Sequence, residues 1–401
     1  MHQIKLGGMQ VVALTAMMIL AFTGSLGLPF NIDAITKSFG VGNSEAGLVV
    51  SFEMLAIAVG TLAIGIVARG VPARRIYALG VLVIVLLNLL CMAVTNVALL
   101  TVLRIPVGFC LGAIVATVMA TAARSDRPES TFGIINASVG AMGIVIGIVL
   151  PQALLLHERL ALPTQLAGLY LVYAVFAAVA VLFLRAVPVA PPIIVEAGAA
   201  PAERFPPRRW LGLLGLGLLF FGHGVLGVFI VNLGGGIGMA MDQIGYVLSA
   251  GAVLGVAVPL LAGQFGVRVP AAYWVTSLAA LIVLFAFLVA TAGTPTLFAV
   301  AVPLYGVLPM ALIPVFLGAL ARVDTTGRLA GAHPAFVLVG GAVAPFVGGA
   351  LSDFGGFIAN AAAVAVCALL GSLLMWSDLR RSDELRASLL RGGTIASSAS
   401  A

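Results

Sequence analysis

Long apolar runs alternate with short polar or charged connections along almost the whole chain. Each run approaches the roughly 20 residues that an α-helix needs to cross a bilayer core of about 30 Å. The pattern predicts an all-α membrane protein with twelve transmembrane helices. These are expected near residues 9–30, 45–68, 76–97, 98–122, 131–156, 165–186, 210–233, 243–265, 270–291, 295–320, 329–351 and 356–377.

One long connection, residues 187–209, contains six prolines and leaves six spans on either side of it. The second span of each half opens in a similar way, with Ser44-Glu45-Ala46-Gly47 in one and Asp242-Gln243-Ile244-Gly245 in the other. A repeat of this kind is typical of a transporter with its substrate site between two helical bundles. We expect an N-terminal bundle over 1–186, a linker over 187–209, a C-terminal bundle over 210–378 and a tail over 379–401.

Composition supports the membrane interpretation. Of the 401 residues, 62% are hydrophobic and only 8% are charged, whereas soluble domains carry about 25% charged residues. The apolar content also excludes a disordered chain. Three cysteines, each inside an apolar run, are too few and too dispersed for a disulfide framework.

The net charge of +6 is a topology signal rather than a sign of nucleic-acid binding, because the basic residues are scattered between apolar runs. Of the 20 basic residues, 17 fall on one side of the predicted spans, Lys37 and Arg159 fall on the other, and Arg104 lies within a span. The positive-inside rule then predicts both termini in the cytoplasm. The long apolar run of the first span and the lack of a cleavage site after it argue against a removable signal peptide.

Two charged residues lie deep inside predicted spans. Arg104 is about 9 Å from the outer end of the fourth span, and Glu53 is about 12 Å from the outer end of the second. Gly108 and Gly112 follow Arg104 on one stripe of the helix. A carboxyl group that alternates between a wet and a closed cavity can load and release a proton. We interpret Glu53 as a proton carrier and Arg104 as its partner, with purely structural roles as the alternative.

Other polar residues of the spans are candidates for substrate binding. His223 lies in the seventh span, where a neutral imidazole can bind a substrate or relay protons. Tyr305 lies in the tenth span together with three prolines, which bend a helix and suit a gating element. Asn31, a further candidate for substrate binding, stands near the outer end of the first span. Asp33, beside it, is a further candidate for proton coupling and either pairs with Arg104 or faces water. Packing roles remain open for each of them.

Several chemistries find no support in the sequence. Neither of the two lysines follows a phosphate-binding glycine loop, so no ATP-driven pump is expected. No zinc motif of the His-Glu-x-x-His type is present, and we expect no enzyme activity, no cofactor and no metal. The residues favour transport driven by a gradient.

Three segments resemble the major facilitator superfamily of bacterial transporters. Residues 104–112, with Arg104 followed by Gly108 and Gly112, resemble the fourth-helix motif, whose arginine is associated with energy coupling in proton-coupled members. Residues 65–75, with Gly65, Arg74 and Arg75, resemble the loop signature after the second helix. Residues 324–329 and the glycine-rich 340–349 resemble the loop before the eleventh helix and that helix.

The resemblance implies two six-helix bundles around a central cavity lined by the first, fourth, seventh and tenth helices. It also implies a gate. Its residues would be Gly65, Arg69, Arg74, Arg75, Gly108 and Gly112. The chain departs from the family where Arg69 replaces the usual Asp, so the gate must close through other contacts. The antiporter signature of the fifth helix is only hinted at by Gly140, Gly143 and Gly147.

We therefore expect a proton-coupled transporter of the bacterial inner membrane that exports a small, largely hydrophobic compound by alternating access. Proton-coupled uptake of an organic acid, held by Arg104 or His223, is the alternative. A sensor or partner protein that keeps the fold without transporting is the alternative from another class. The expected partners are the substrate, protons and the lipid bilayer, with no nucleic acid, and the fold requires only a monomer.

Overall fold

The computed structural model describes residues 4–67, 71–188, 210–265, 269–324 and 328–398. Over these ranges the chain is helical, apart from short connections and one β-bridge between Ile4 and Ser125. The helices in order are α1 (Gly8–Leu26), α2 (Leu28–Phe39), α3 (Asn43–Val67), α4 (Ala73–Cys91), α5 (Val97–Ala123), α6 (Pro128–Arg159), α7 (Gln165–Val181), α8 (Leu211–Gly227), α9 (Ile230–Gly236), α10 (Met241–Phe265), α11 (Ala271–Ala290), α12 (Pro295–Val323) and α13 (Arg328–Ser398).

The predicted fold class is confirmed, because these helices correspond to twelve crossings. Ten stretches of the described residues are long and apolar enough to span a membrane, and α7 is a slightly shorter apolar helix. The longest stretch, α13, consists of two helices joined at a kink at Gly355 and Gly356. Gly356 has a φ of 64° with extended ψ, a conformation that only glycine adopts readily, so the chain can reverse there.

The first and seventh spans differ from the prediction because each is broken into two helices and runs further. α1 and α2 meet at Gly27, and α8 and α9 meet at Val228 and Phe229. The first span was predicted to end near residue 30, since polar residues follow. The helix instead continues to Phe39 because Lys37 pairs with Asp33 one turn away, which satisfies both charges within α2.

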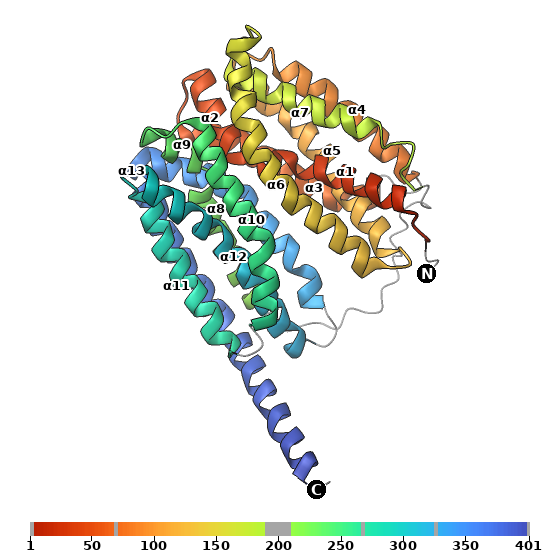
Figure 1. Ribbon diagram of the computed structural model, residues 1–401, viewed down its shortest axis with the longest axis vertical. Coiled ribbons are helices and arrows are strands. Elements are labelled where there is room, and N and C mark those ends of the chain that lie inside the picture. The colour runs from red at the N-terminus through yellow and green to blue at the C-terminus, as the bar shows by residue number, and fades with distance from the viewer. Residues whose placement is uncertain (1–3, 68–70, 189–209, 266–268, 325–327, 399–401) are drawn as a thin grey trace.

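The two halves of the chain form two groups of helices that meet at one end (Figure 1). The red-to-yellow helices α1–α7 make one group and the green-to-blue helices α8–α13 make the other. α2 lies beside α9 at the upper end of the view, while the second helix of α13 extends as far as Ser398, well past the predicted span end at 377.

Within the first group, glycines bring α3 and α5 into backbone contact. A Cβ added to Gly108 or Gly112 of α5 would collide with the carbonyl groups of Glu53 and Ile57 in α3, and one added to Gly60 would collide with the carbonyl of Phe109. Small residues allow such close crossings between membrane helices. The stripe that the sequence predicted beside Arg104 therefore holds α3 against α5.

Two seams join the halves. On one, Gly47 of α3 packs against Pro345 of α13, and the hydroxyl of Ser51 accepts a hydrogen bond of 3.1 Å from the backbone N–H of Phe346. On the other seam, Gly245 of α10 packs against Gly147 of α6.

The second seam is also closed by a serine. The hydroxyl of Ser249 donates a hydrogen bond of 3.0 Å to the carbonyl of Ile144 in α6. Gly47 and Ser51 thus have the same spacing and the same place in their half as Gly245 and Ser249. The two seams are related by the repeat.

The glycine crossing predicts a specific loss of stability. Gly112→Ala is expected to lower the free energy of unfolding by about 1–3 kcal/mol, because the methyl group must push α3 away from α5. Gly133→Ala in α6 is the matched control, since nothing lies within 4 Å of a Cβ there. Equilibrium unfolding of both variants in detergent provides the measurement. Equal stabilities would contradict the crossing.

Candidate functional site

A buried ion pair between Arg104 and Glu53 is the central feature of the first helix group. The Nε atom of Arg104 donates to Oε2 of Glu53 at 2.8 Å, and its Nη2 atom donates to Oε1. Both side chains are 2% exposed. A bidentate pair has the geometry in which a guanidinium binds a carboxylate most strongly. The structure thus joins the two residues that the sequence placed at similar depth.

Two further helices complete the surroundings of Arg104. Its Nη1 atom donates to the side-chain oxygen of Asn88 in α4 at 2.8 Å. The aromatic ring of Tyr170 in α7 lies 5.0 Å from the guanidinium carbon, within the range of a cation–π contact. The guanidinium is therefore held by α3, α4 and α7, and its contacts lie inside the first group of helices.

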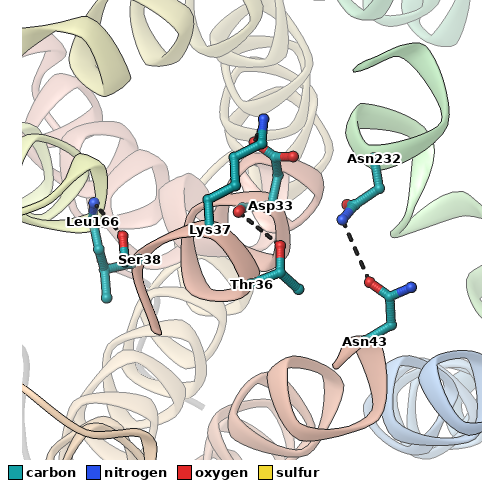
Figure 2. Close-up of polar contacts among 7 residues, drawn as sticks. All are labelled: Asp33, Thr36, Lys37, Ser38, Asn43, Leu166 and Asn232. Atoms are coloured by element: carbon teal, nitrogen blue, oxygen red, sulfur yellow. Dashed lines mark hydrogen bonds and ion pairs between the residues drawn. The ribbon is translucent and has the colours of Figure 1, made fainter. Parts of the chain in front are cut away.

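Asp33 does not join this pair, so the interpretation that it pairs with Arg104 is wrong. Its Oδ2 atom accepts a hydrogen bond of 2.9 Å from Lys37, which is half exposed (Figure 2). Charges four residues apart on a helix are neighbours, and this partner is closer in the chain than Arg104. Asn31, two residues before Asp33, is also buried, and its side-chain oxygen has no partner among the described residues.

His223 and Tyr305 are in contact in the second helix group. Their ring centres are 4.4 Å apart, and the hydroxyl of Tyr305 donates to the backbone carbonyl of His223 at 2.8 Å. That hydroxyl is therefore used within the protein. The Nδ1 atom of His223 is buried and has no hydrogen-bond partner in the described part of the chain. Of the two, His223 is the one with hydrogen-bonding capacity to spare.

An apolar groove of about 400 Å³ lies between α8 and the first helix of α13. Its volume falls within the roughly 300–1,000 Å³ of typical small-molecule sites. Glycines 217 and 340 form its floor, where the backbones of the two helices touch. The side chains that line the groove are all apolar: Leu214, Leu218, Phe221, Ala335, Phe336 and Val339.

The predicted cytoplasmic gate is described only in part. Arg74 and Arg75 are exposed at the start of α4, and Gly65 lies near the end of α3. Arg69 lies outside the described residues. Gly108 and Gly112 belong to the α3–α5 crossing described above.

A set of polar contacts at the opposite end of the helices was not predicted. The carboxylate of Asp353, at the end of the first helix of α13, accepts hydrogen bonds from the backbone N–H groups of Asn43 at 3.1 Å and Ser44 at 2.8 Å. It thus caps the N-terminus of α3 from the other half of the chain, where helix N–H groups need acceptors. The side chain of Asn232 in α9 donates to Asn43 at 3.4 Å (Figure 2). The halves are joined at this end.

The sequence contains one signal for the contacts between the two halves. The repeated spacing of Gly47 and Ser51 with Gly245 and Ser249 marks both seams. The cap by Asp353 leaves no comparable signal, because it depends on two segments that are far apart in the chain. Tyr170 and Tyr173 were likewise missed, since aromatic residues inside an apolar helix look like packing.

Comparison with known proteins identifies a family. Residues 12–332 match the family model described as Major Facilitator Superfamily. No curated protein sequence matches the chain significantly.

The fold is similar to that of solved transporters. The structure of the nucleoside transporter NupG is 13% identical, covers 92% of this chain and 98% of its own, and has a TM-score of 0.68. The peptide transporter POT in complex with sulfate is 13% identical over 94% of this chain and 95% of its own, with a TM-score of 0.71. A bacterial homologue of the human lysosomal transporter Spinster, solved in an inward-facing and unoccupied conformation, is 13% identical over 95% and 97%, with a TM-score of 0.63.

The cap on α3 predicts how this end opens. Asp353→Ala is expected to shift the protein toward states in which the two halves separate there, because the cap is worth about 0.5–2 kcal/mol. Spin labels on Leu160→Cys in the first half and Thr291→Cys in the second would report the separation by pulsed electron resonance. Asp242→Ala is the matched control, since Asp242 begins the repeat-related helix and its carboxylate accepts from the adjacent Gln243. Identical distance distributions in both variants would rule out the cap as a latch.

Proposed function

Since the chain belongs to the Major Facilitator Superfamily and is a secondary transporter of that type, we propose that it exchanges protons for a small, largely hydrophobic compound. Export by alternating access across the bacterial inner membrane is the proposed direction. The proposal assigns proton binding to Glu53 and substrate binding to the apolar groove and His223.

The observation that carries the proposal is the buried pair of Glu53 and Arg104. With Glu53 ionised the pair is neutral, so it can rest in an apolar interior. A proton on Glu53 leaves Arg104 as a buried cation without its counter-charge, and breaking such a pair costs about 3–5 kcal/mol. That free energy favours a rearrangement of α3 against α5. Proton binding therefore has a direct mechanical consequence for the helices that carry the pair.

The apolar groove supports the substrate class. A surface made of leucine, phenylalanine, valine and alanine offers a sugar or a peptide almost no hydrogen bonds, whereas it can bury an apolar compound. His223 stands two residues after Phe221 in α8, so its side chain points to another face of that helix, toward Tyr305 of α12. The unpartnered Nδ1 atom of His223 would supply one hydrogen bond to a compound that reaches that face.

Alternating access requires the joined end of the two halves to open. In the present state Asp353, Asn43 and Asn232 hold that end together. The positive-inside pattern predicts that it faces outward, so the state is one closed to the outside. Breaks at Gly27 and after Gly227 give the first and seventh spans points at which they can bend.

The alternatives have less support in the geometry. Uptake of an organic acid through Arg104 would require that guanidinium to release Glu53, because its contacts go to Glu53, Asn88 and Tyr170. A non-transporting sensor is favoured only by the altered loop at Arg69, which lies outside the described residues.

Replacing the carboxyl of Glu53 tests the coupling. In liposomes with a trapped pH dye, wild-type protein is expected to give a pH change that depends on a lipophilic cation, a neutral antibiotic or an aromatic acid, and its sign identifies export or uptake. Glu53→Gln is expected to abolish the pH change, since an amide cannot take up the proton. Glu45→Gln is the matched control, because Glu45 is an exposed carboxylate at the start of the same helix. A pH change that persists in Glu53→Gln contradicts the assignment.

Arg104→Lys separates the two roles considered for Arg104. A lysine keeps the charge but loses the bidentate fork and the flat stacking surface. If Arg104 acts through Glu53, we expect substrate affinity to stay within about twofold while the coupled pH change falls about tenfold, as the loss of one charged hydrogen bond would give. Binding measured by fluorescence quenching and transport measured in liposomes provide the two values. Lost binding in a folded protein would instead favour the organic-acid alternative.

A further inference from the structure

A small cavity lies directly beside the guanidinium of Arg104. Its volume is about 20 Å³ for water-sized contents, and four helices enclose it. A cavity needs about 10–15 Å³ by that measure to hold one water molecule. Its lining includes Gly24 of α1, Asn88 of α4, Arg104 and Val107 of α5, and Tyr173 of α7.

Polar groups with unused hydrogen-bonding capacity line this cavity. The hydroxyl of Tyr173 is buried and has no partner among the described residues. A guanidinium has five N–H donors, and the contacts of Arg104 with Glu53 and Asn88 use three of them. An unsatisfied buried polar group costs about 1–3 kcal/mol, and ordered water is the usual remedy where space allows.

The carboxylate of Glu53 lies close to one wall of the cavity. Gly24 forms part of its wall, and a Cβ built on Gly24 would lie 3.6 Å from Oε1 of Glu53. Because glycine has no side chain, no group of α1 at this position stands between the cavity and that carboxylate oxygen. A water molecule here would lie beside Arg104 and close to the carboxylate of Glu53.

Tyr173 connects this place to the break in the first span. A Cβ on Gly27, the residue between α1 and α2, would collide with the hydroxyl of Tyr173. The hydroxyl therefore lies against the point where α1 ends and α2 begins. A change of angle at Gly27 would move the hydroxyl or close the cavity.

We propose that the cavity binds one ordered water molecule, held by the hydroxyl of Tyr173 and the guanidinium of Arg104, and that this water exchanges protons with Glu53. The inference rests on the proposed function of Glu53. In the loading step the water donates one proton to a carboxylate oxygen of Glu53 as it accepts another from the solvent side, so Glu53 becomes neutral and the water is restored. The reverse step releases the proton. Tyr173 is a positioning residue, because it acts through the water.

A high-resolution structure of the full chain in a lipid nanodisc tests the site without any substrate. We expect a water peak within hydrogen-bond distance of the Tyr173 hydroxyl and Arg104. Val107→Ile adds a methyl group at a lining position and should remove the peak, and so should Tyr173→Phe. Tyr170→Phe is the matched control, since it removes an equally buried and unpartnered hydroxyl from a side chain of α7 that does not line the cavity, and the peak should remain. No peak in the wild type, or a peak that persists in Tyr173→Phe, overturns the proposal.

Transport kinetics test the role of the water. Tyr173→Phe and Val107→Ile are each expected to lower the maximal coupled rate about tenfold with an unchanged half-saturating concentration, as the loss of one hydrogen bond in the transfer step would give. Transfer should also become rate-limiting, so heavy water should slow both variants more than it slows the wild type. A merely structural role would leave that isotope effect unchanged, and this result would overturn the relay.

The two proposals can fail separately. If the coupled pH change survives in Glu53→Gln, the assignment of the proton to Glu53 fails while the water peak is still open to observation. If Glu53→Gln is inactive but the wild type has no water peak, the coupling stands and the water site fails. Should Tyr173→Phe not fold, Val107→Ile tests the same cavity without touching a polar group.

Discussion

An arginine and a glutamate that neutralise each other inside an apolar bundle set the main constraint on this structure. Neither charge could remain buried alone, so α3 and α5 must stay close enough for a two-point contact between Glu53 and Arg104. The glycines at positions 60, 108 and 112 meet that need by letting the backbones touch. Asn88 and Tyr170 then add α4 and α7 to the same centre. The packing of the first helix group and its candidate chemistry thus depend on one interaction.

The second helix group is organised differently. Its close crossings are also made by glycines. Its polar residues His223 and Tyr305 contact each other, and its groove is apolar. The first group thus contains the buried pair of Glu53 and Arg104, and the second contains the apolar groove. The seams between α3 and α13 and between α6 and α10 are the mechanical link between them.

The two seams share a repeat but are not equivalent. Each has a glycine followed four residues later by a serine that bonds to the facing helix. The α3 seam adds a carboxylate from the opposite half, since Asp353 caps α3, whereas Asp242 at the start of α10 accepts from its own neighbour. The repeat accounts for the glycine and serine contacts that both seams share. The Asp353 cap is present on the α3 seam. Opening of the joined end therefore requires the N-terminus of α3 to lose this cap.

The sequence by itself determined the membrane class, the twelve spans and the family, because each depends on local properties: apolar length, charge placement and short motifs. It also placed Glu53 and Arg104 at a similar depth, since helical rise converts position into depth. Only the tertiary structure decided which groups meet. Asp33 pairs with Lys37 rather than Arg104, and Tyr173 borders the cavity beside Arg104. The rotation of each helix about its own axis decides which side chains meet. These rotations are set by the packing of all the helices together, and the spacing of residues along one helix does not determine them.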